Sequence, residues 1–154
     1  MSMFSDMLLK KSTTVIAFII LISIIVIGII FDMLGVAVTV ADERPFNSMA
    51  SSKIKGAKSS LMLIKNAGRV SNVFNDVVGD TCGIISGTSA AFIVSQIGGS
   101  VDFIDAAVFS MILSGLVAAG TIGGKAMGKD IAIGRSKEIV TIVGKIISVF
   151  TERK

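Results

Sequence analysis

The sequence has no histidine, no tryptophan and no tyrosine, and it contains a single cysteine, Cys82. One cysteine cannot form an intramolecular disulfide. A zinc or haem site is not expected, because the sequence lacks imidazole groups and has one thiol. Any metal bound here must be a hard cation held by oxygen atoms. An enzyme is not expected either, because no nucleophile lies beside a base and Cys82 has the position of a packing residue.

Apolar residues are present in excess. They make up 52% of the 154 residues, and the mean hydropathy of +0.84 lies outside the usual composition of a soluble domain. They collect in three runs, 13–31, 77–97 and 103–122, each near the ~20 residues that cross a bilayer as a helix. The first run is too long for the apolar region of a cleaved signal peptide. We therefore predict an all-α integral membrane protein, with residues 1–154 forming a single membrane domain.

Basic residues are distributed unevenly between the predicted spans. Six lie in segment 42–75 and seven follow the third span, whereas the short link between the second and third spans carries only Asp102 and Asp105. The positive-inside rule places both basic segments in the cytoplasm. Three spans then give a multi-pass protein of the cell membrane with its N-terminus outside and its C-terminus in the cytoplasm. Membrane topology accounts for the net charge of +4, so the expected partner is the lipid bilayer and not a nucleic acid.

Two amphipathic stretches, 48–67 and 131–150, are predicted as cytoplasmic juxtamembrane helices. In the first, alanine, isoleucine and leucine recur at helical spacing, and the lysines lie off that stripe. In the second, isoleucines and valines oppose Lys137 and Lys145. Two interpretations are open. The apolar faces lie on the inner membrane surface with the lysines near anionic headgroups, or they pack on the protein itself.

Small residues recur at every fourth position of the second predicted span: Gly79, Gly83, Gly87, Ala91 and Ser95. The third span repeats this pattern with Gly115, Ala119 and Gly123. Such rows let helix backbones approach closely, which in lipid substitutes for a hydrophobic driving force. The rows predict helix packing, either between the second and third spans of one chain or across a homodimer interface.

Acidic residues interrupt the start of the second span. Asp76 and Asp80 share one helical face, within roughly 60°, with two glycines of the row. A charged residue near the centre of a span costs at least ~2.5 kcal/mol and normally faces a cavity or a partner. One interpretation is a hard-cation site, Mg²⁺ or Na⁺, and the other is that both aspartates only cap the helix start. The other two spans would add oxygen ligands from Asp32, Thr39 and Thr121.

Three motifs resemble the transmembrane domain of the CorB/CorC and cyclin M (CNNM) magnesium transporter family. VGDT at 78–81 stands where the family has Val-Gly-Asn-Asn. GTIGGK at 120–125 resembles Gly-Glu-Ile-x-Pro-Lys, with Thr121 in place of the glutamate. After the first span, Ala37 and Thr39 correspond to the family's Ser-x-Ser-Glu-Thr-Ala-Leu-Thr stretch. The chain is similar to a divergent, stand-alone form of that domain that lacks the regulatory CBS domains.

The resemblance spans residues 18–150 and implies a homodimer that binds or transports a divalent cation, Mg²⁺, with transport coupled to Na⁺. In this hypothesis Asp80 is the principal ligand, and a separate cytoplasmic subunit supplies regulation. The alternative is a non-transporting membrane scaffold or accessory subunit, assembled through the glycine rows, in which the aspartates are helix caps. A holin-like pore former fits the small size and basic tail, but not the polar residues near the spans.

Overall fold

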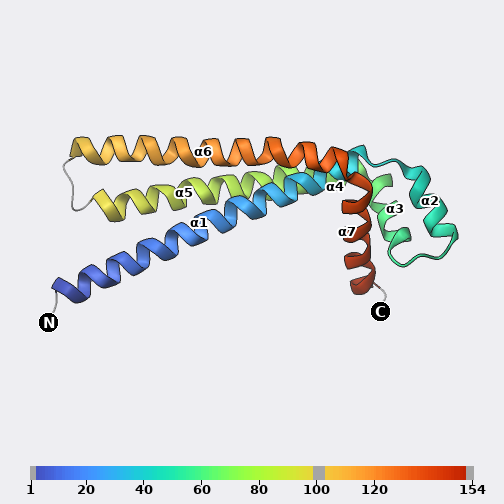
Figure 1. Cartoon of the computed structure of the whole chain (residues 1–154), viewed down its shortest axis with the longest axis horizontal. Coiled ribbons are helices and arrows are strands. Elements are labelled where there is room, and N and C mark those ends of the chain that lie inside the picture. The colour runs from blue at the N-terminus through green and yellow to red at the C-terminus, as the bar shows by residue number, and fades with distance from the viewer. Residues whose placement is uncertain (1–2, 99–102, 152–154) are drawn as a thin grey trace.

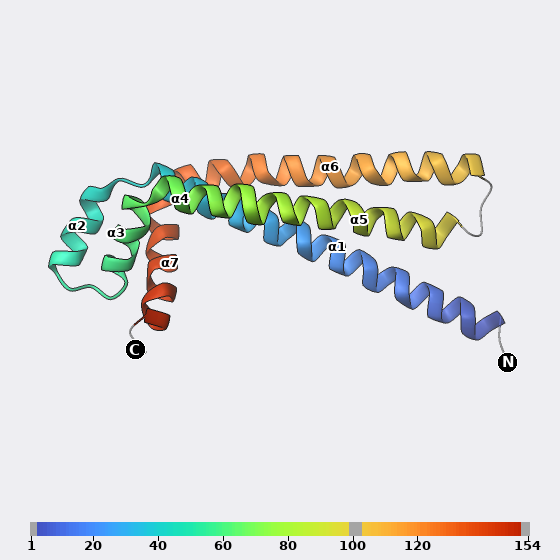
Figure 2. The ribbon, with the colours of Figure 1, turned by 180° about the vertical axis from the view of Figure 1, so that it is seen from behind.

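The computed structural model describes the backbone of residues 3–98 and 103–151 and the side chains of 14–95 and 107–149. These residues form α1 (Met3–Val40), α2 (Glu43–Ser51), α3 (Ala57–Lys65), α4 (Ala67–Asn72), the π-helix η1 (Val73–Gly79), α5 (Asp80–Gly98), α6 (Phe103–Gly134) and α7 (Ser136–Thr151). Helices α1, α5 and α6 form a long rod, and α2, α3 and α7 gather as a cap at one end of it (Figures 1 and 2). The predicted all-α fold is confirmed for the described residues. The charges of Asp102, Asp105, Arg153 and Lys154, used for the topology, lie outside the described side chains.

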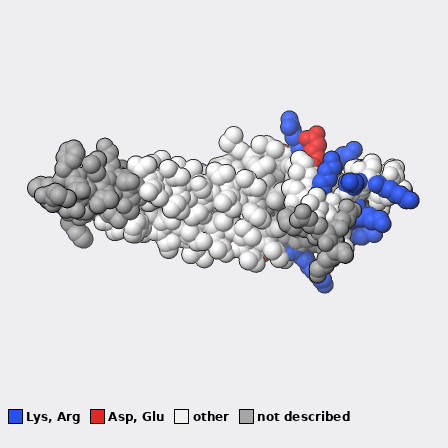
Figure 3. Space-filling model, turned by 90° about the horizontal axis from the view of Figure 1, so that it is seen from below, with Lys and Arg blue, Asp and Glu red and all other residues white. Residues whose placement is uncertain are grey.

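The rod contains three helical stretches long and apolar enough to cross a membrane: Thr14–Val40, Ala67–Ser95 and Ala107–Gly134. Their number agrees with the three predicted spans. Each stretch extends beyond the predicted range at the end near the cap, because the helices continue past their apolar segments. The middle of the rod shows no charged side chain on the face drawn in Figure 3, and the lysine and arginine side chains on this face gather toward the cap.

Helix α1 packs against both α5 and α6, and few side chains are buried between the three helices. The buried residues there are Leu21, Ala90, Ile93 and Leu113. A side chain added at Gly28 of α1 would place its Cβ 3.0 Å from the Cβ of Cys82. Most other large apolar side chains along the rod are exposed, as expected for helices that face lipid.

The cap has its own core, which joins it to the ends of α1 and α6. Its buried members are Ala37, Val38, Phe46, Ile64, Ala132 and Val140. Asp42 caps the start of α2, because its carboxylate accepts a hydrogen bond from the amide of Arg44 (3.0 Å). The hydroxyl of Ser60, fully buried on α3, donates to the carbonyl of Val140 on α7 (3.0 Å). The hydrogen bond from Ser60 to Val140 joins α3 to α7.

The structure differs from the single juxtamembrane helix predicted over 48–67. Helix α2 ends at Ser51 and α3 begins at Ala57, with Lys53 (φ 53°) and Gly56 (φ 82°) both left-handed in the turn between them. Gly56 also packs directly on α7, where an added Cβ would lie 2.7 Å from the amide nitrogen of Lys145. The periodicity of the sequence continues through this turn, so it did not reveal the break.

Helix α7 is amphipathic, as predicted for 131–150, although α6 occupies the first residues of that range. One face of α7, including Val140 and Ser148, is buried. The opposite face exposes an apolar stripe, Ile142, Ile146 and Val149. Of the two interpretations of the amphipathic stretches, packing on the protein is therefore confirmed for the buried face of α7. The opposite face of α7 contacts no other part of the described chain closely enough to be buried.

Candidate functional site

Polar side chains lie near the crossing of η1 and α1, where Lys125 extends from α6, at the end of the rod next to the cap. We call this group the polar junction and define it as Asp32, Gly35, Asn75, Gly79 and Lys125. The π-helix η1 carries two of its members and changes the register of the second span just before α5. Single-turn π-helices occur frequently at functional sites. Phe31 and Phe74 pack edge to face beside the junction, with ring centroids 5.4 Å apart.

Asn75 is the buried polar group of the junction. Its amide nitrogen donates to the hydroxyl of Ser71 (3.3 Å). Its oxygen Oδ1 is buried and accepts no hydrogen bond among the described residues. This oxygen lies directly against Gly35 of α1, so closely that a Cβ at position 35 would overlap it. Position 35 therefore has no room for a side chain while Asn75 keeps this orientation.

Lys125 of α6 reaches the carboxylate of Asp32 on α1, with an Nζ–Oδ1 distance of 3.8 Å. The two side chains are 32% and 19% exposed. The same ammonium would lie 3.6 Å from a Cβ added at Gly79, so Lys125 covers the end of η1. The positive charge beside the carboxylate of Asp32 is therefore the ammonium group of Lys125.

The predicted oxygen ligands do not converge. Asp76 and Asp80 are exposed, and Asp32 pairs with Lys125. The hydroxyls of Thr39 and Thr121 donate to backbone carbonyls of their own helices, at 2.9 and 2.7 Å. Within the described part of the chain, no three residues of His, Cys, Asp or Glu form a group that could hold a metal ion. A cation at the junction would have to replace the ammonium of Lys125 as the partner of Asp32.

A groove of about 360 Å³ runs between α5 and α6 along the apolar part of the rod. Its lining is small or hydroxylated for the most part: Gly83, Ser86, Gly87, Ala90, Ser114, Val117, Ala118, Thr121 and Ile122. Thr121 stands one helical turn before Lys125, and Gly83 one turn after Gly79. The groove therefore begins beside the polar junction and extends into the apolar rod.

The glycines that pack inside the chain are mostly not those of the predicted rows. A Cβ added at Gly124 would meet Ile29, and one at Gly128 would lie 2.7 Å from Cγ of Met33. By contrast, a Cβ at four glycines of the rows would meet no atom within 4 Å: Gly83, Gly87, Gly115 and Gly123. The other row members Ala91, Ser95 and Ala119 are exposed, and Gly79 is buried. In the structure, these four glycines therefore do not bring the second and third spans into close contact.

Sequence reasoning missed Asn75 and the pairing of Lys125. Asn75 stands four residues before Gly79, so it shares a helical face with the row of small residues, and this was the available signal. Lys125 counted only as a basic residue of the cytoplasmic tail. Comparison of the chain with protein families, with curated proteins and with solved structures gave no match.

Proposed function

We propose that this chain is a three-span membrane scaffold or accessory subunit that assembles as a homodimer through the groove between α5 and α6. The observation that carries this proposal is the open space in front of Gly83 and Gly87. In lipid, a helix of another molecule gains by packing closely against such a surface, since the absence of side chains lets backbones approach. A second copy of the chain offers a matching row of small residues on its own α5.

The arrangement also supports a topology. The start of α1, the end of α5 and the start of α6 lie at one end of the rod, and the basic cap lies at the other (Figure 1). The proposal keeps the cap in the cytoplasm by the positive-inside rule, which leaves the start of α1 outside. The separate cytoplasmic regulatory subunit stays a prediction.

Gly87→Leu tests the homodimer. A Cβ at this position meets no atom within 4 Å, so a leucine enters the open groove, and we expect the fold to be retained while the partner helix is excluded. Gly120→Leu is the matched control, because Gly120 also faces open space but does not line the groove. Light scattering in mild detergent should give the mass of a dimer for the wild type and for Gly120→Leu, and the mass of a monomer for Gly87→Leu. A wild-type monomer, or a dimer in all three proteins, would contradict the proposal.

A second candidate function is binding or transport of a divalent cation, Mg²⁺, at the polar junction. The buried, unpartnered oxygen of Asn75 favours it, because such an oxygen is a ligand for a hard cation. Asp32 supplies a carboxylate on the neighbouring helix, and Asp76 and Asp80 lie exposed on the same helical stretch. In this mechanism Lys125 competes with the metal for Asp32.

Thermal unfolding in detergent tests the cation site, since a ligand that binds only the folded state raises the midpoint. We expect Mg²⁺ to raise the midpoint of the wild type, to raise that of Lys125→Met further, and to leave Asp32→Asn unchanged. Asp80→Asn shows whether that carboxylate contributes. Calcium, sodium and choline are the ionic controls. If Mg²⁺ shifts neither the wild type nor Lys125→Met, the junction holds no metal.

A further inference from the structure

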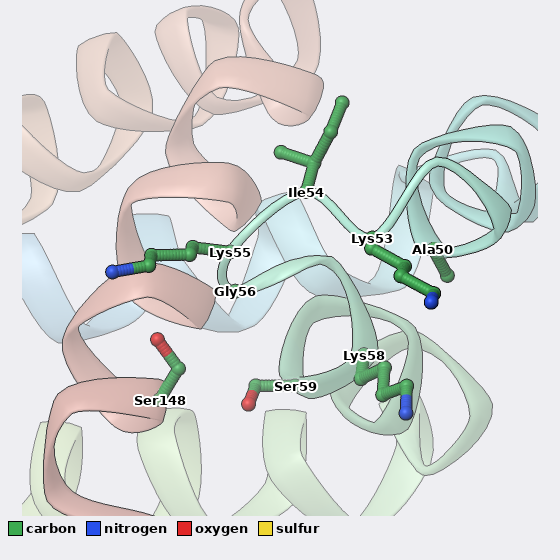
Figure 4. Close-up of a pocket in the computed structure, with 8 residues that line it drawn as sticks. All are labelled: Ala50, Lys53, Ile54, Lys55, Gly56, Lys58, Ser59 and Ser148. Carbon is green, nitrogen blue, oxygen red and sulfur yellow. The ribbon is translucent and has the colours of Figure 1, made fainter. Parts of the chain in front are cut away.

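A basic pocket lies in the cap, between the turn that joins α2 to α3 and the last turns of α7 (Figure 4). Its volume is about 280 Å³. Three lysines and two serines contribute to its lining: Lys53, Lys55, Lys58, Ser59 and Ser148. Ala50, Ile54 and Gly56 complete the lining, so none of the lining residues is acidic. The lining therefore combines three exposed lysines with two serines and carries no negative charge.

The backbone around this pocket is fixed by close packing. Gly56 and Gly144 interlock where α3 crosses α7: a Cβ at Gly144 would lie 2.7 Å from the carbonyl oxygen of Gly56. The left-handed residues Lys53 and Gly56 set the direction of the turn, so the Cα positions of the lysines in and beside the turn are fixed. In Figure 4 the hydroxyl of Ser59 points toward α7 and the Lys55 ammonium lies beside α7, whereas the ammonium groups of Lys53 and Lys58 lie on the side of α3 away from α7. The hydroxyl of Ser148 donates to the carbonyl of Lys145 (2.8 Å), so its oxygen lines the pocket while its proton is engaged within α7.

The chemistry of the lining selects a phosphate group. Lysine binds phosphate as a point charge, and a hydroxyl donates a hydrogen bond to a phosphate oxygen. No side chain caps α3 at Gly56, so backbone amides of its first turn add to the positive potential. A carboxylate ligand would use fewer of these donors, because phosphate offers more acceptor oxygens.

The position of the pocket indicates where the phosphate comes from. Helix α7 runs across the end of the rod and not along it (Figure 1). Its exposed apolar stripe, Ile142, Ile146 and Val149, faces away from α3, as on helices that lie in a membrane interface. The buried face of α7 contributes Ser148 to the pocket. With α7 at the membrane surface, the pocket stands at the level of the lipid headgroups and the soluble phosphates next to them.

We infer that this basic pocket binds a phosphate-bearing anion, the headgroup of an anionic phospholipid in the cytoplasmic leaflet. The inference requires the cap to lie beside a membrane. It does not depend on the homodimer or on a cation at the polar junction, so failure of either leaves it standing.

The test measures binding of the full-length protein in detergent to short-chain phosphatidylglycerol, with short-chain phosphatidylcholine and inorganic phosphate as separate arms. The pocket variant replaces Lys53, Lys55 and Lys58 with Gln. The matched control replaces three exposed lysines that do not line the pocket, Lys65, Lys129 and Lys137, with Gln. Both variants lose the same charge. Ser59→Leu is a further variant that obstructs the pocket without changing any charge.

We expect phosphatidylglycerol, and not phosphatidylcholine, to bind the wild type. Since a hydrogen bond to a charged group is worth about 1.5–3 kcal/mol, loss of the lysines that pair with the phosphate should raise the Kd at least about tenfold in the pocket variant. The Kd should remain close to wild type in the control, whose lysines do not line the pocket. Ser59→Leu should also weaken binding. Binding of inorganic phosphate with the same dependence on the variants would assign the pocket to a soluble phosphate and support the site. Equal losses in the pocket and control variants, full binding by Ser59→Leu, or no binding by the wild type would overturn it.

Discussion

Gly144→Ala tests how the cap is held together. An added Cβ at this position would meet the hydroxyl oxygen of Ser60, the carbonyl oxygen of Gly56 at 2.7 Å and the amide nitrogen of Ser60 at 2.9 Å. Two of these three atoms belong to the backbone, so a rotation of a side chain cannot relieve the overlap. Helix α7 must move away from α3.

The expected loss follows from the contacts that change. Overpacking costs about 1–3 kcal/mol, and displacement of α7 weakens the buried hydrogen bond from Ser60 to Val140, which is worth about 1 kcal/mol. Alanine is better than glycine inside a helix and restores about 0.5–1 kcal/mol. The net destabilisation of the contact between α3 and α7 is therefore about 1–3 kcal/mol.

Hydrogen exchange of the α7 amides measures this contact directly, because it reports the free energy of local opening. Exchange in Gly144→Ala should be faster than in the wild type by roughly 5- to 150-fold. Gly134→Ala is the control, since nothing lies within 4 Å of its added Cβ, and its α7 amides should exchange no faster than those of the wild type. Unchanged exchange in Gly144→Ala would refute the interlocked packing of α3 and α7.

Two further predictions concern the polar junction. Gly35→Ala should destabilise the protein by about 1–3 kcal/mol in equilibrium unfolding from mixed micelles, because its Cβ overlaps the side chain of Asn75. The same change in an Asn75→Ala background should cost less than about 0.5 kcal/mol, and an equal cost in both backgrounds would disprove the contact. A double-mutant cycle of Asp32→Asn and Lys125→Met should give a coupling energy of no more than about 1 kcal/mol, because the pair is partly exposed and 3.8 Å apart. A much larger coupling would mean that the pair is more deeply shielded from water than the structure indicates.

The number of long helices could be predicted from the sequence, because each apolar run has the length that a span requires. Their ends could not. The helices α1 and α6 continue to Val40 and Gly134, where buried residues such as Ala37 and Ala132 join the core of the cap. Tertiary packing, and not hydropathy, decides where these helices end.

The turn between α2 and α3 shows a second limit of the sequence patterns. Apolar residues keep their helical spacing through Lys53 and Gly56, although both have left-handed backbone conformations. The conformation of this turn depends on a contact with α7, nearly ninety positions later in the chain. A long-range contact of this kind leaves no local signal except the glycine.

The candidate site was predictable only in part. Asp32 lies at the polar junction, as expected for a polar group that ends the first apolar run. Asn75 lies in the π-helix η1 and contacts Gly35 of α1, while Asp76 and Asp80 are exposed. A calculation at 100° per residue assumes a regular α-helix, so it could not anticipate the π-helix.

The central claim is that Gly83 and Gly87 receive a second copy of the chain. The most direct measurement is the number of copies per complex in liposomes, obtained by photobleaching of fluorescently labelled protein at several protein-to-lipid ratios. We predict that the wild type and Gly120→Leu bleach in two steps at dilutions where Gly87→Leu bleaches in one. Single-step bleaching of the wild type, or two-step bleaching that persists in Gly87→Leu, would contradict the claim.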